Sequence, residues 1–208
     1  LRSGWPRVLS GPPATGAAPE FLWLQMGGVG GNAEGNCARG EPTLVVGRLD
    51  RLWAFCPGGE PLPGWGLSLG DSMVPGLAAG DPDGDGFPEV LVQTVRSGVA
   101  FVNRDGRPSP GWPRPSTDED LRTATPALAL DVQGDGRPEV VVMNGSGLLA
   151  AIRPDGHVPE GWPLATGAGA AGTLLAADLD RNGSLDLVAP DRDTLLYAYS
   201  LPVSAGPP

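Results

Sequence analysis

The segment Asp81-Pro-Asp-Gly-Asp-Gly-Phe-Pro-Glu89 indicates how this chain folds, because closely related segments occur twice more. These are DVQGDGRPE at Asp131–Glu139 and DLDRNGSLD at Asp178–Asp186. Each nine-residue loop has oxygen-bearing side chains at positions 1, 3, 5 and 9 and glycine at position 6. One such loop is ordinary turn chemistry, since Asp and Gly are common turn residues. Three copies at near-constant spacing indicate a shared role.

Alternating oxygens on a tightly turned loop suit Ca²⁺, which takes about six to eight oxygen ligands, one of them the backbone carbonyl of position 7. The sequence therefore predicts up to three Ca²⁺ sites. The predicted ligands are Asp81, Asp83, Asp85, Phe87 (carbonyl) and Glu89; Asp131, Gln133, Asp135, Arg137 (carbonyl) and Glu139; and Asp178, Asp180, Asn182, Ser184 (carbonyl) and Asp186. The first loop has the most carboxylates and is expected to bind most tightly, because charge tunes affinity.

The residues around the loops predict strands, not the helices of an EF-hand. An EF-hand has a bidentate acid at position 12, where these loops have Val92, Val142 and Ala189. The runs Glu89–Thr94 and Glu139–Met143 follow the loops directly and are rich in β-branched residues. Such runs, bounded by Gly and Pro, are typical of strands. Short apolar segments also precede each loop, so the loops are predicted to join strands.

Composition favours a turn-rich β protein outside the cell. The 208 residues include 33 Gly and 24 Pro, yet 40% are hydrophobic and fall in short regular runs. The net charge of −10 argues against nucleic acid and anionic membrane surfaces as partners. No apolar run reaches the roughly 18 residues of a membrane span. Because millimolar calcium outside the cell suits loops with three or four acids, a secreted, extracellular or cell-surface location is expected.

A repeat of about 50 residues with about four strands per unit predicts the blades of a β-propeller. After each of the first two loops come two strands with a tight turn between them, a turn containing Asp-Gly, and a Gly-Trp pair. The expected fold is therefore an all-β propeller of four-stranded blades in a single domain, 1–208. The predicted units are 20–66, 73–113, 123–163 and 172–201, with a closing strand at 1–10. The tryptophans at 5, 65, 112 and 162 are expected to wedge between neighbouring blades.

Closure of the ring is predicted from the two ends of the chain. The last unit has no Gly-Trp-Pro, whereas Leu1–Pro6 ends in one. Pairing of this segment with the last blade would close a four-bladed ring and remove the free sheet edge. The alternative is that these residues are half of a larger propeller, completed by a second copy or by further sequence.

The pattern D-x-D-x-D-G-x-x-[DE], between an apolar strand and a Val-rich strand, resembles the FG-GAP and VCBS repeats of integrin alpha-chain propellers and bacterial secreted proteins. The resemblance covers about Met73–Tyr199 and is weak over residues 1–70. It implies one Ca²⁺ in each loop, and a propeller that serves adhesion or the recognition of proteins or glycans. Members often have about seven blades, so closure at four departs from the family pattern.

The first unit has a Gly-rich segment where the others have acidic loops. Cys37 lies in this segment and Cys56 ends the third strand of the same unit. By analogy with the other units, that strand end lies near the base of the segment, which predicts a disulfide between the two cysteines. It would contribute about 3 kcal/mol through the unfolded state. Two unrelated buried thiols are the alternative.

No group of residues suggests catalysis. His157 is the only histidine and follows a Pro-Asp-Gly turn, and there is no G-x-S-x-G segment. We therefore expect a non-catalytic, calcium-stabilised propeller for protein–protein adhesion, scaffolding or assembly, with a protein or glycan partner at the cell surface or in the extracellular matrix. A homo-oligomer or filament fits this role. The alternatives are a carbohydrate-binding lectin and an accessory domain of a secreted polysaccharide-active enzyme.

Removing residues 1–10 tests the closing strand. If Leu1–Pro6 is the outer strand of the last blade, its loss exposes a bare edge that invites aggregation. The loss of a buried Trp5 alone would cost about 3–5 kcal/mol. A chain that begins at Gly11 should therefore be insoluble or melt at a much lower temperature. A soluble monomer with an unchanged melting temperature would favour the half-propeller alternative.

Overall fold

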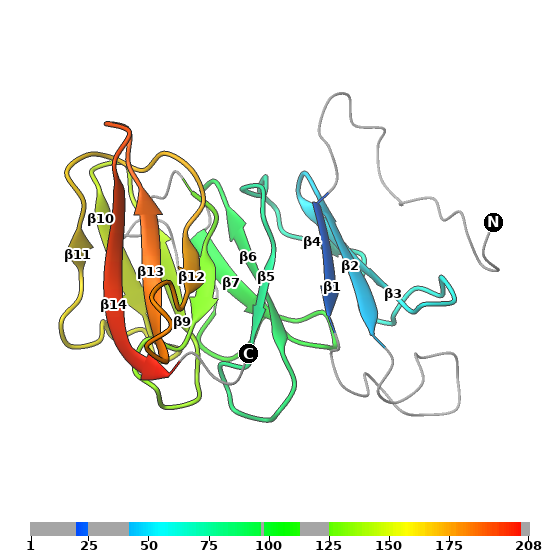
Figure 1. The fold of residues 1–208 in the computed structure, drawn as a ribbon. Helices are drawn as coiled ribbons and strands as arrows, with labels where there is room; N and C mark the ends of the chain where they lie inside the picture. Colours follow the sequence, from blue (N-terminus) through cyan, green and yellow to red (C-terminus); the bar gives the residue numbers. More distant parts are fainter. Residues whose placement is uncertain (1–19, 25–41, 97, 113–124, 205–208) are drawn as a thin grey trace.

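The computed structural model describes residues 20–24, 42–96, 98–112 and 125–204. Within them the chain is all-β, as predicted, and forms four antiparallel sheets (Figure 1). The strands are β1 (Glu20–Leu24), β2 (Thr43–Arg48), β3 (Arg51–Phe55), β4 (Leu67–Ser68), β5 (Ala78–Gly80), β6 (Glu89–Thr94), β7 (Gly98–Val102), β8 (Leu128–Leu130), β9 (Glu139–Met143), β10 (Leu148–Ile152), β11 (Leu164–Ala165), β12 (Leu175–Ala177), β13 (Ser184–Pro190) and β14 (Leu196–Ser204). No helix long and apolar enough to cross a membrane occurs in these ranges.

Each sheet pairs strands that are neighbours in the sequence, so each is a meander, and we number the sheets as blades 1 to 4. Blade 1 has the order β1-β2-β3-β4 and blade 3 the order β8-β9-β10-β11. The described strands of blade 2 are β5-β6-β7, and those of blade 4 are β12-β13-β14. A series of such meanders is the architecture of a propeller.

The second strands of blades 2 and 3 are buried along their whole length. β6 and β9 coincide with the Val-rich runs that were predicted as strands, and every residue in them is buried. A strand covered on both faces by neighbouring sheets has no face exposed to solvent, so it does not need polar residues at alternate positions. This explains why their central residues, Val90–Val92 and Val140–Val142, are apolar without alternation.

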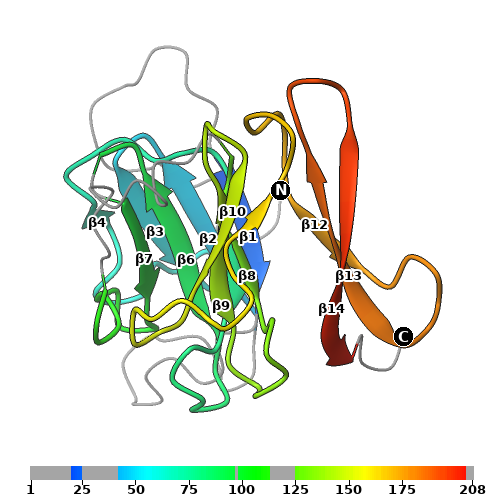
Figure 2. The same cartoon turned by 90° about the vertical axis from the view of Figure 1, so that its left-hand side faces the viewer.

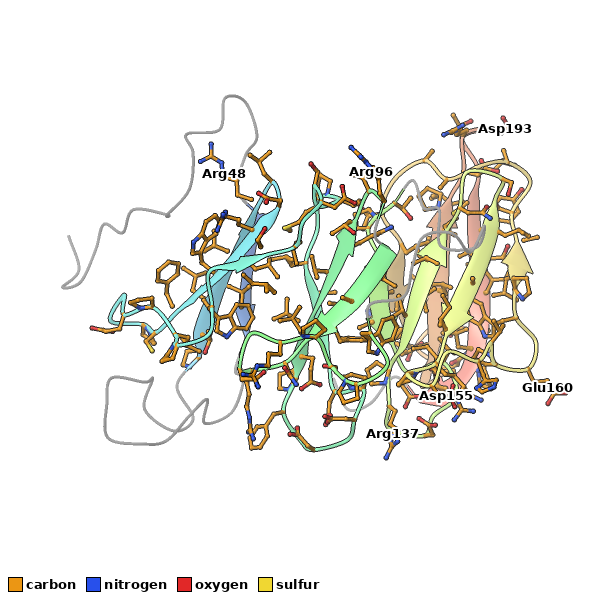
Figure 3. The ribbon with its side chains drawn as sticks, turned by 180° about the vertical axis from the view of Figure 1, so that it is seen from behind. Arg48, Arg96, Arg137, Asp155, Glu160 and Asp193 are labelled. Carbon is orange, nitrogen blue, oxygen red and sulfur yellow. The ribbon has the colours of Figure 1, made fainter. Side chains whose placement is uncertain are left out.

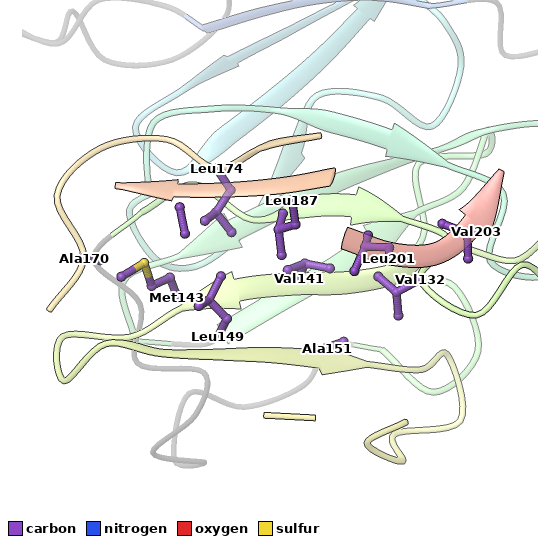
Figure 4. Close-up of a cluster of buried hydrophobic side chains, with 11 residues drawn as sticks. Val132, Val141, Met143, Leu149, Ala151, Ala170, Leu174, Leu187, Leu201 and Val203 are labelled. Carbon is purple, nitrogen blue, oxygen red and sulfur yellow. The ribbon is translucent and has the colours of Figure 1, made fainter. Parts of the chain in front are cut away.

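The core consists of separate layers between successive blades. Blades 1 and 2 share one cluster of buried side chains, blades 2 and 3 a second, and blades 3 and 4 a third. In the third cluster, Met143 and Leu149 of blade 3 meet Leu174 and Leu187 of blade 4 (Figure 4). Each blade therefore depends on its neighbour to bury its apolar face.

The repeating tryptophans lie in these layers, as predicted. Trp65 packs against the cluster between blades 1 and 2, and Trp162 against the cluster between blades 3 and 4. Trp112 lies between blades 2 and 3, where its ring meets Phe101 edge to face with centroids 5.2 Å apart. Trp5 lies outside the described residues.

The two end blades lie at opposite ends of the series (Figure 1). Figure 2 shows β12, β13 and β14 set apart on the far side of β8–β10. On the face of blade 4 that turns away from blade 3, Leu175 and Leu196 are 57% and 74% exposed. No hydrophobic cluster of the described residues joins blade 4 to blade 1. The closing strand at 1–10 lies outside the described residues, so closure stays a prediction.

The last strand is longer than the sequence suggested. The predicted last unit ends at residue 201, but β14 continues to Ser204, which pairs with Ser184 past an irregularity in the ladder. The corresponding strands β7 and β10 end in turns that contain Asp-Gly. Blade 4 has Pro202-Val203 instead, and these residues cannot supply the positive φ of the glycine, so the strand runs on.

Truncating a buried leucine in one of these layers tests the dependence of each blade on its neighbour. Leu187→Ala should lower the free energy of unfolding by about 2–5 kcal/mol, because it leaves a cavity between blades 3 and 4. Leu196→Ala is the matched control on the exposed face and should change it by less than about 0.5 kcal/mol. Urea unfolding of both variants gives the comparison. Equal losses for the two variants would contradict the assignment of the core.

Candidate metal centres

The three acidic loops occupy the same place in blades 2, 3 and 4. Each joins the first strand of its blade to the second, and the ninth residue of the loop pairs with the residue just before the first. These cross-strand pairs are Gly80 with Glu89, Leu130 with Glu139, and Ala177 with Asp186. The sheet thereby holds both ends of each loop together.

The first aspartate of each loop organises the turn by accepting backbone hydrogen bonds. Oδ1 of Asp81 accepts from the amide nitrogens of Gly84 and Asp85 at 2.7 and 3.1 Å, and its Oδ2 accepts from Gly86 at 2.8 Å. Asp131 accepts the three equivalent bonds in its loop, and Asp178 accepts the two from the fifth and sixth residues of its loop. Because a carboxylate is the best acceptor for several amides at once, aspartate at this position folds the loop locally.

The fifth residue of each loop orients position 7. Oδ1 of Asp85 accepts from the amide of Phe87 at 2.9 Å, and Asp135 does the same for Arg137 at 2.9 Å. In the third loop, Oδ1 of Asn182 accepts from Ser184 at 2.7 Å. All three loops therefore share one backbone form, although their residues differ at positions 3, 4 and 5.

The ninth residue of each loop is a buried acid at the start of the second strand. Glu89, Glu139 and Asp186 are 3%, 1% and 6% exposed. Glu89 Oε2 and Glu139 Oε1 are buried without any hydrogen-bond partner. A buried carboxylate oxygen without a partner is unfavourable unless a proton or a cation compensates it.

The charge state of these acids reflects that environment. Burial, and then the negative charge of Asp83, raises the pKa of Glu89 from 4.5 to about 8. Burial likewise raises the pKa of Glu139 above its ordinary value, although the amide of Val132 donates to its Oε2 at 2.9 Å. The metal-free loops therefore hold their buried glutamates in the protonated form at pH values where free glutamate is ionised.

Two of the loops bring three acids close enough to share one ion. Ligand oxygens of each group lie within 4.8 Å of one another, and the groups are Asp81, Asp83 and Glu89, and Asp178, Asp180 and Asp186. The second loop has Gln133 at position 3 and forms no such three-acid group among the described residues. The first loop combines such a cluster with the orphaned oxygen of Glu89, an arrangement that fits a hard divalent cation such as Ca²⁺.

Two contacts of the loops were not foreseen from the sequence. Ser200 Oγ donates to Asp186 Oδ1 at 2.7 Å, which satisfies the third buried acid from strand β14. Arg153 lies 4.0 Å from Asp135 in the second loop. The sequence contains no local signal for either contact. Only the register of β13 and β14, in which Asp186 and Ser200 are partners, places the serine at the loop.

The loops lie at one end of the sheets, together with the turns that follow the third strands. Figure 3 shows Arg137 of the second loop at the same end as Asp155, and Arg48, Arg96 and Asp193 at the opposite end. Arg104, from the turn of blade 2, lies over the ring of Phe87 in the first loop at 5.2 Å. Contacts between loop and turn therefore recur at this end.

The predicted disulfide falls only partly within the described residues. Cys37 lies outside them, so its pairing stays a prediction. Cys56 directly follows β3 and is 4% exposed. His157 was expected at an exposed turn, and its side chain is 82% exposed, with Nδ1 at 3.1 Å from Asp155.

Comparison with known proteins supports the class of fold. The family model of the FG-GAP-like repeat matches residues 131–189, which include the second and third loops. The resemblance to FG-GAP repeats is thus confirmed for this part of the chain. No curated protein matches the chain.

Solved structures support the same conclusion. The chain is similar to BBS1N in a crystal structure of its complex with ARL6DN, soaked with mercury, with a TM-score of 0.64 and 16% identity over 91% of this chain and 53% of that one. For the crystal of the same complex soaked with lead, the TM-score is 0.60 and the identity is 15%. That match covers 95% of this chain and 58% of the other. At this identity the likeness shows the fold alone, a β-propeller. The chain spans somewhat more than half the length of these matches.

Glu89→Gln tests the buried carboxyl, because glutamine resembles the protonated acid. Between about pH 4.5 and 8 the metal-free folded chain keeps a proton that the unfolded chain has lost, so its free energy of unfolding falls as the pH rises. In chelator, the variant should therefore become progressively more stable than the wild type over this range. In Ca²⁺ the order should reverse, because the neutral amide is a weaker ligand.

Urea unfolding at several pH values, with chelator and with Ca²⁺, measures both effects. Glu160→Gln changes an exposed acid outside the loops and should follow the wild type in both conditions. A stability difference between Glu89→Gln and wild type that stays constant from about pH 5 to about pH 8 would contradict the raised pKa.

Proposed function

We propose that this chain is a non-catalytic propeller that binds other proteins outside the cell or at its surface, with blades 2, 3 and 4 stabilised by up to three Ca²⁺ ions. The observation that carries the calcium part is the orphaned oxygen of Glu89 and of Glu139 at equivalent positions in two loops. An uncompensated buried acid destabilises the fold, so its occurrence at the same position of two loops indicates a shared function. A cation at each loop would compensate both acids.

The protein-binding part rests on the fold and on its matches. A propeller is a rigid series of sheets that presents turns and loops at its two ends, and such scaffolds position variable loops for recognition. The matched propeller BBS1N is found in a complex with another protein, ARL6DN. We extend the general role of protein binding to this chain, without extending that partner.

In the proposed arrangement, the first, third, fifth and ninth residues of each loop supply side-chain oxygens and the seventh supplies its carbonyl. In the first and third loops, the ion would neutralise the repulsion among carboxylates whose oxygens lie within 4.8 Å of one another. It would also join both ends of the loop to the start of the buried second strand. Calcium would thereby stiffen the end of the sheets where the loops and turns meet.

Removal of calcium should destabilise the fold. Each ion at about 100 times its dissociation constant stabilises the folded state by about 2.7 kcal/mol, so loss of even one site should lower the melting temperature by about 5–10 °C. Thermal unfolding in chelator and in millimolar Ca²⁺ measures the shift. Asp178→Ala should lose part of the shift, and Asp193→Ala, outside the loops, should keep all of it. An identical melting curve in chelator and in Ca²⁺ would refute the calcium proposal.

Capture experiments test the binding role. The full chain, immobilised in Ca²⁺, should retain defined proteins from extracellular material, and these should be released by chelator because removal of the ions destabilises the loops. Binding to a glycan array without any protein partner would favour the lectin alternative. Turnover of a polysaccharide by the purified chain would contradict a non-catalytic role.

A further inference from the structure

The turn after the third strand packs against the preceding blade. In blade 2 this turn is Asn103–Arg107, closed by a hydrogen bond from the amide of Gly106 to the carbonyl of Asn103 at 2.9 Å. The indole Nε1 of Trp65 in blade 1 donates to the carbonyl of Arg104 at 2.9 Å. Gly64 and Gly106 lie so close that a Cβ on either would clash with the backbone of the other turn. The Gly-Trp pair of blade 1 thus receives the Asp-Gly turn of blade 2.

Blade 4 does not supply this turn to blade 3. Blades 2 and 4 can be aligned through equivalent cross-strand pairs. These are Leu91 with Phe101 in blade 2 and Val188 with Ala198 in blade 4. In this alignment Pro202-Val203 stands where blade 2 has Asp105-Gly106. Because β14 continues as a strand, Val203 lies beside the second loop and is only 5% exposed. A side chain added at Gly134 in that loop would have its Cβ 3.4 Å from Cγ1 of Val203.

The Gly-Trp pair of blade 3 is therefore left open. Gly161 has the same φ of 84° as Gly64, yet a Cβ built on it would meet no atom within 4 Å. The indole N–H of Trp162 makes no hydrogen bond within the described part of the chain. A pocket of about 640 Å³ opens beside this pair. Its lining includes Gln133, Glu160, Trp162, Tyr199, Leu201 and Pro202.

We propose that this pocket, between Trp162 and β14, binds a tight Asp-Gly turn flanked by arginine from a partner protein. The chain itself shows what fits such a site, because the Arg104-Asp-Gly-Arg107 turn occupies the equivalent place between blades 1 and 2. The charges agree as well. Glu160 is exposed at the pocket, the pocket lining contains no basic residue, and Figure 3 shows Glu160 projecting at the end where the loops lie.

Each element of the pocket has a role in this recognition. The indole N–H of Trp162 donates to a carbonyl of the incoming turn, as Trp65 does to Arg104. Gly161 lets the backbone of that turn approach closely, since it has no side chain in the way. Glu160 pairs with a flanking arginine. The inference deepens the proposed protein-binding function and rests on it, because it names the chemistry of one partner surface.

A cyclic peptide with the sequence of residues 102–109, Val-Asn-Arg-Asp-Gly-Arg-Pro-Ser, is the probe, labelled for fluorescence polarisation against the full chain in Ca²⁺. Trp162→Phe keeps an aromatic ring but removes the N–H donor, and should weaken binding about fivefold or more. Trp65→Phe is the matched control and should leave the affinity unchanged, because Trp65 already donates to Arg104.

A double-mutant cycle tests the charge pairing. Glu160→Gln should weaken binding of the arginine-containing peptide, and should have no effect on a peptide in which both arginines are alanine. Melting curves of each variant in Ca²⁺ show whether the fold is intact. Loss of affinity with an unchanged melting temperature supports the proposal.

Three outcomes would overturn it: no binding at millimolar peptide, equal affinities of Trp162→Phe and Trp65→Phe, or binding of a glycan but not the peptide at Trp162. Binding of the peptide only to Trp5→Ala would also overturn it, because the chain's own first residues would then occupy the pocket. None of these outcomes changes the effect of chelator on melting or the capture of proteins elsewhere on the surface. Failure here is thus distinguishable from failure of the proposed function.

Discussion

Burial of an acid at the start of the second strand is the constraint on which blades 2, 3 and 4 depend. Glu89, Glu139 and Asp186 stand where a strand enters the core, and the surrounding loop adds further carboxylates. At Glu89 and Glu139, desolvation and repulsion both oppose ionisation. The chain compensates the charge differently in each blade: Asp186 receives hydrogen bonds from Ser200 and Leu179, whereas Glu89 and Glu139 each keep one oxygen without a partner. The proposed cation in each loop would compensate the acid at all three positions.

The packing of the blades follows from a second, simpler requirement. Each sheet is apolar on the face toward its neighbour, so no blade is stable alone and the layers between blades form the core. The hydrogen bond from Trp65 to the turn of blade 2 is another contact by which one blade supports the next, at the end of the sheets. Blade 4 departs from the repeat at Pro202-Val203, and the open pocket at Trp162 is the direct consequence of that departure.

Much of this architecture could be predicted from the sequence because it is periodic. The strands at Glu89–Thr94 and Glu139–Met143 follow from runs rich in β-branched residues, and the loops follow from aspartates at fixed spacing. The orphaned carboxylate oxygens could not be predicted, since they depend on which backbone amides reach the ninth residue. The contact of Ser200 and the extension of β14 depend on strand register, which a short apolar run does not fix. The first unit has no acidic loop, yet the predicted range 20–66 is close to the extent of blade 1, from Glu20 in β1 to Ser68 in β4.

The most direct test of the account is a structure determined from crystals grown in calcium. The account predicts one ion in each loop, 2.3–2.6 Å from the oxygens of its ligands. In the first loop, the oxygen of Glu89 that has no partner should turn to the ion, together with Asp81, Asp83 and the carbonyl of Phe87. Loops that hold only water in saturating calcium, with Glu89 still buried and unpaired, would contradict it.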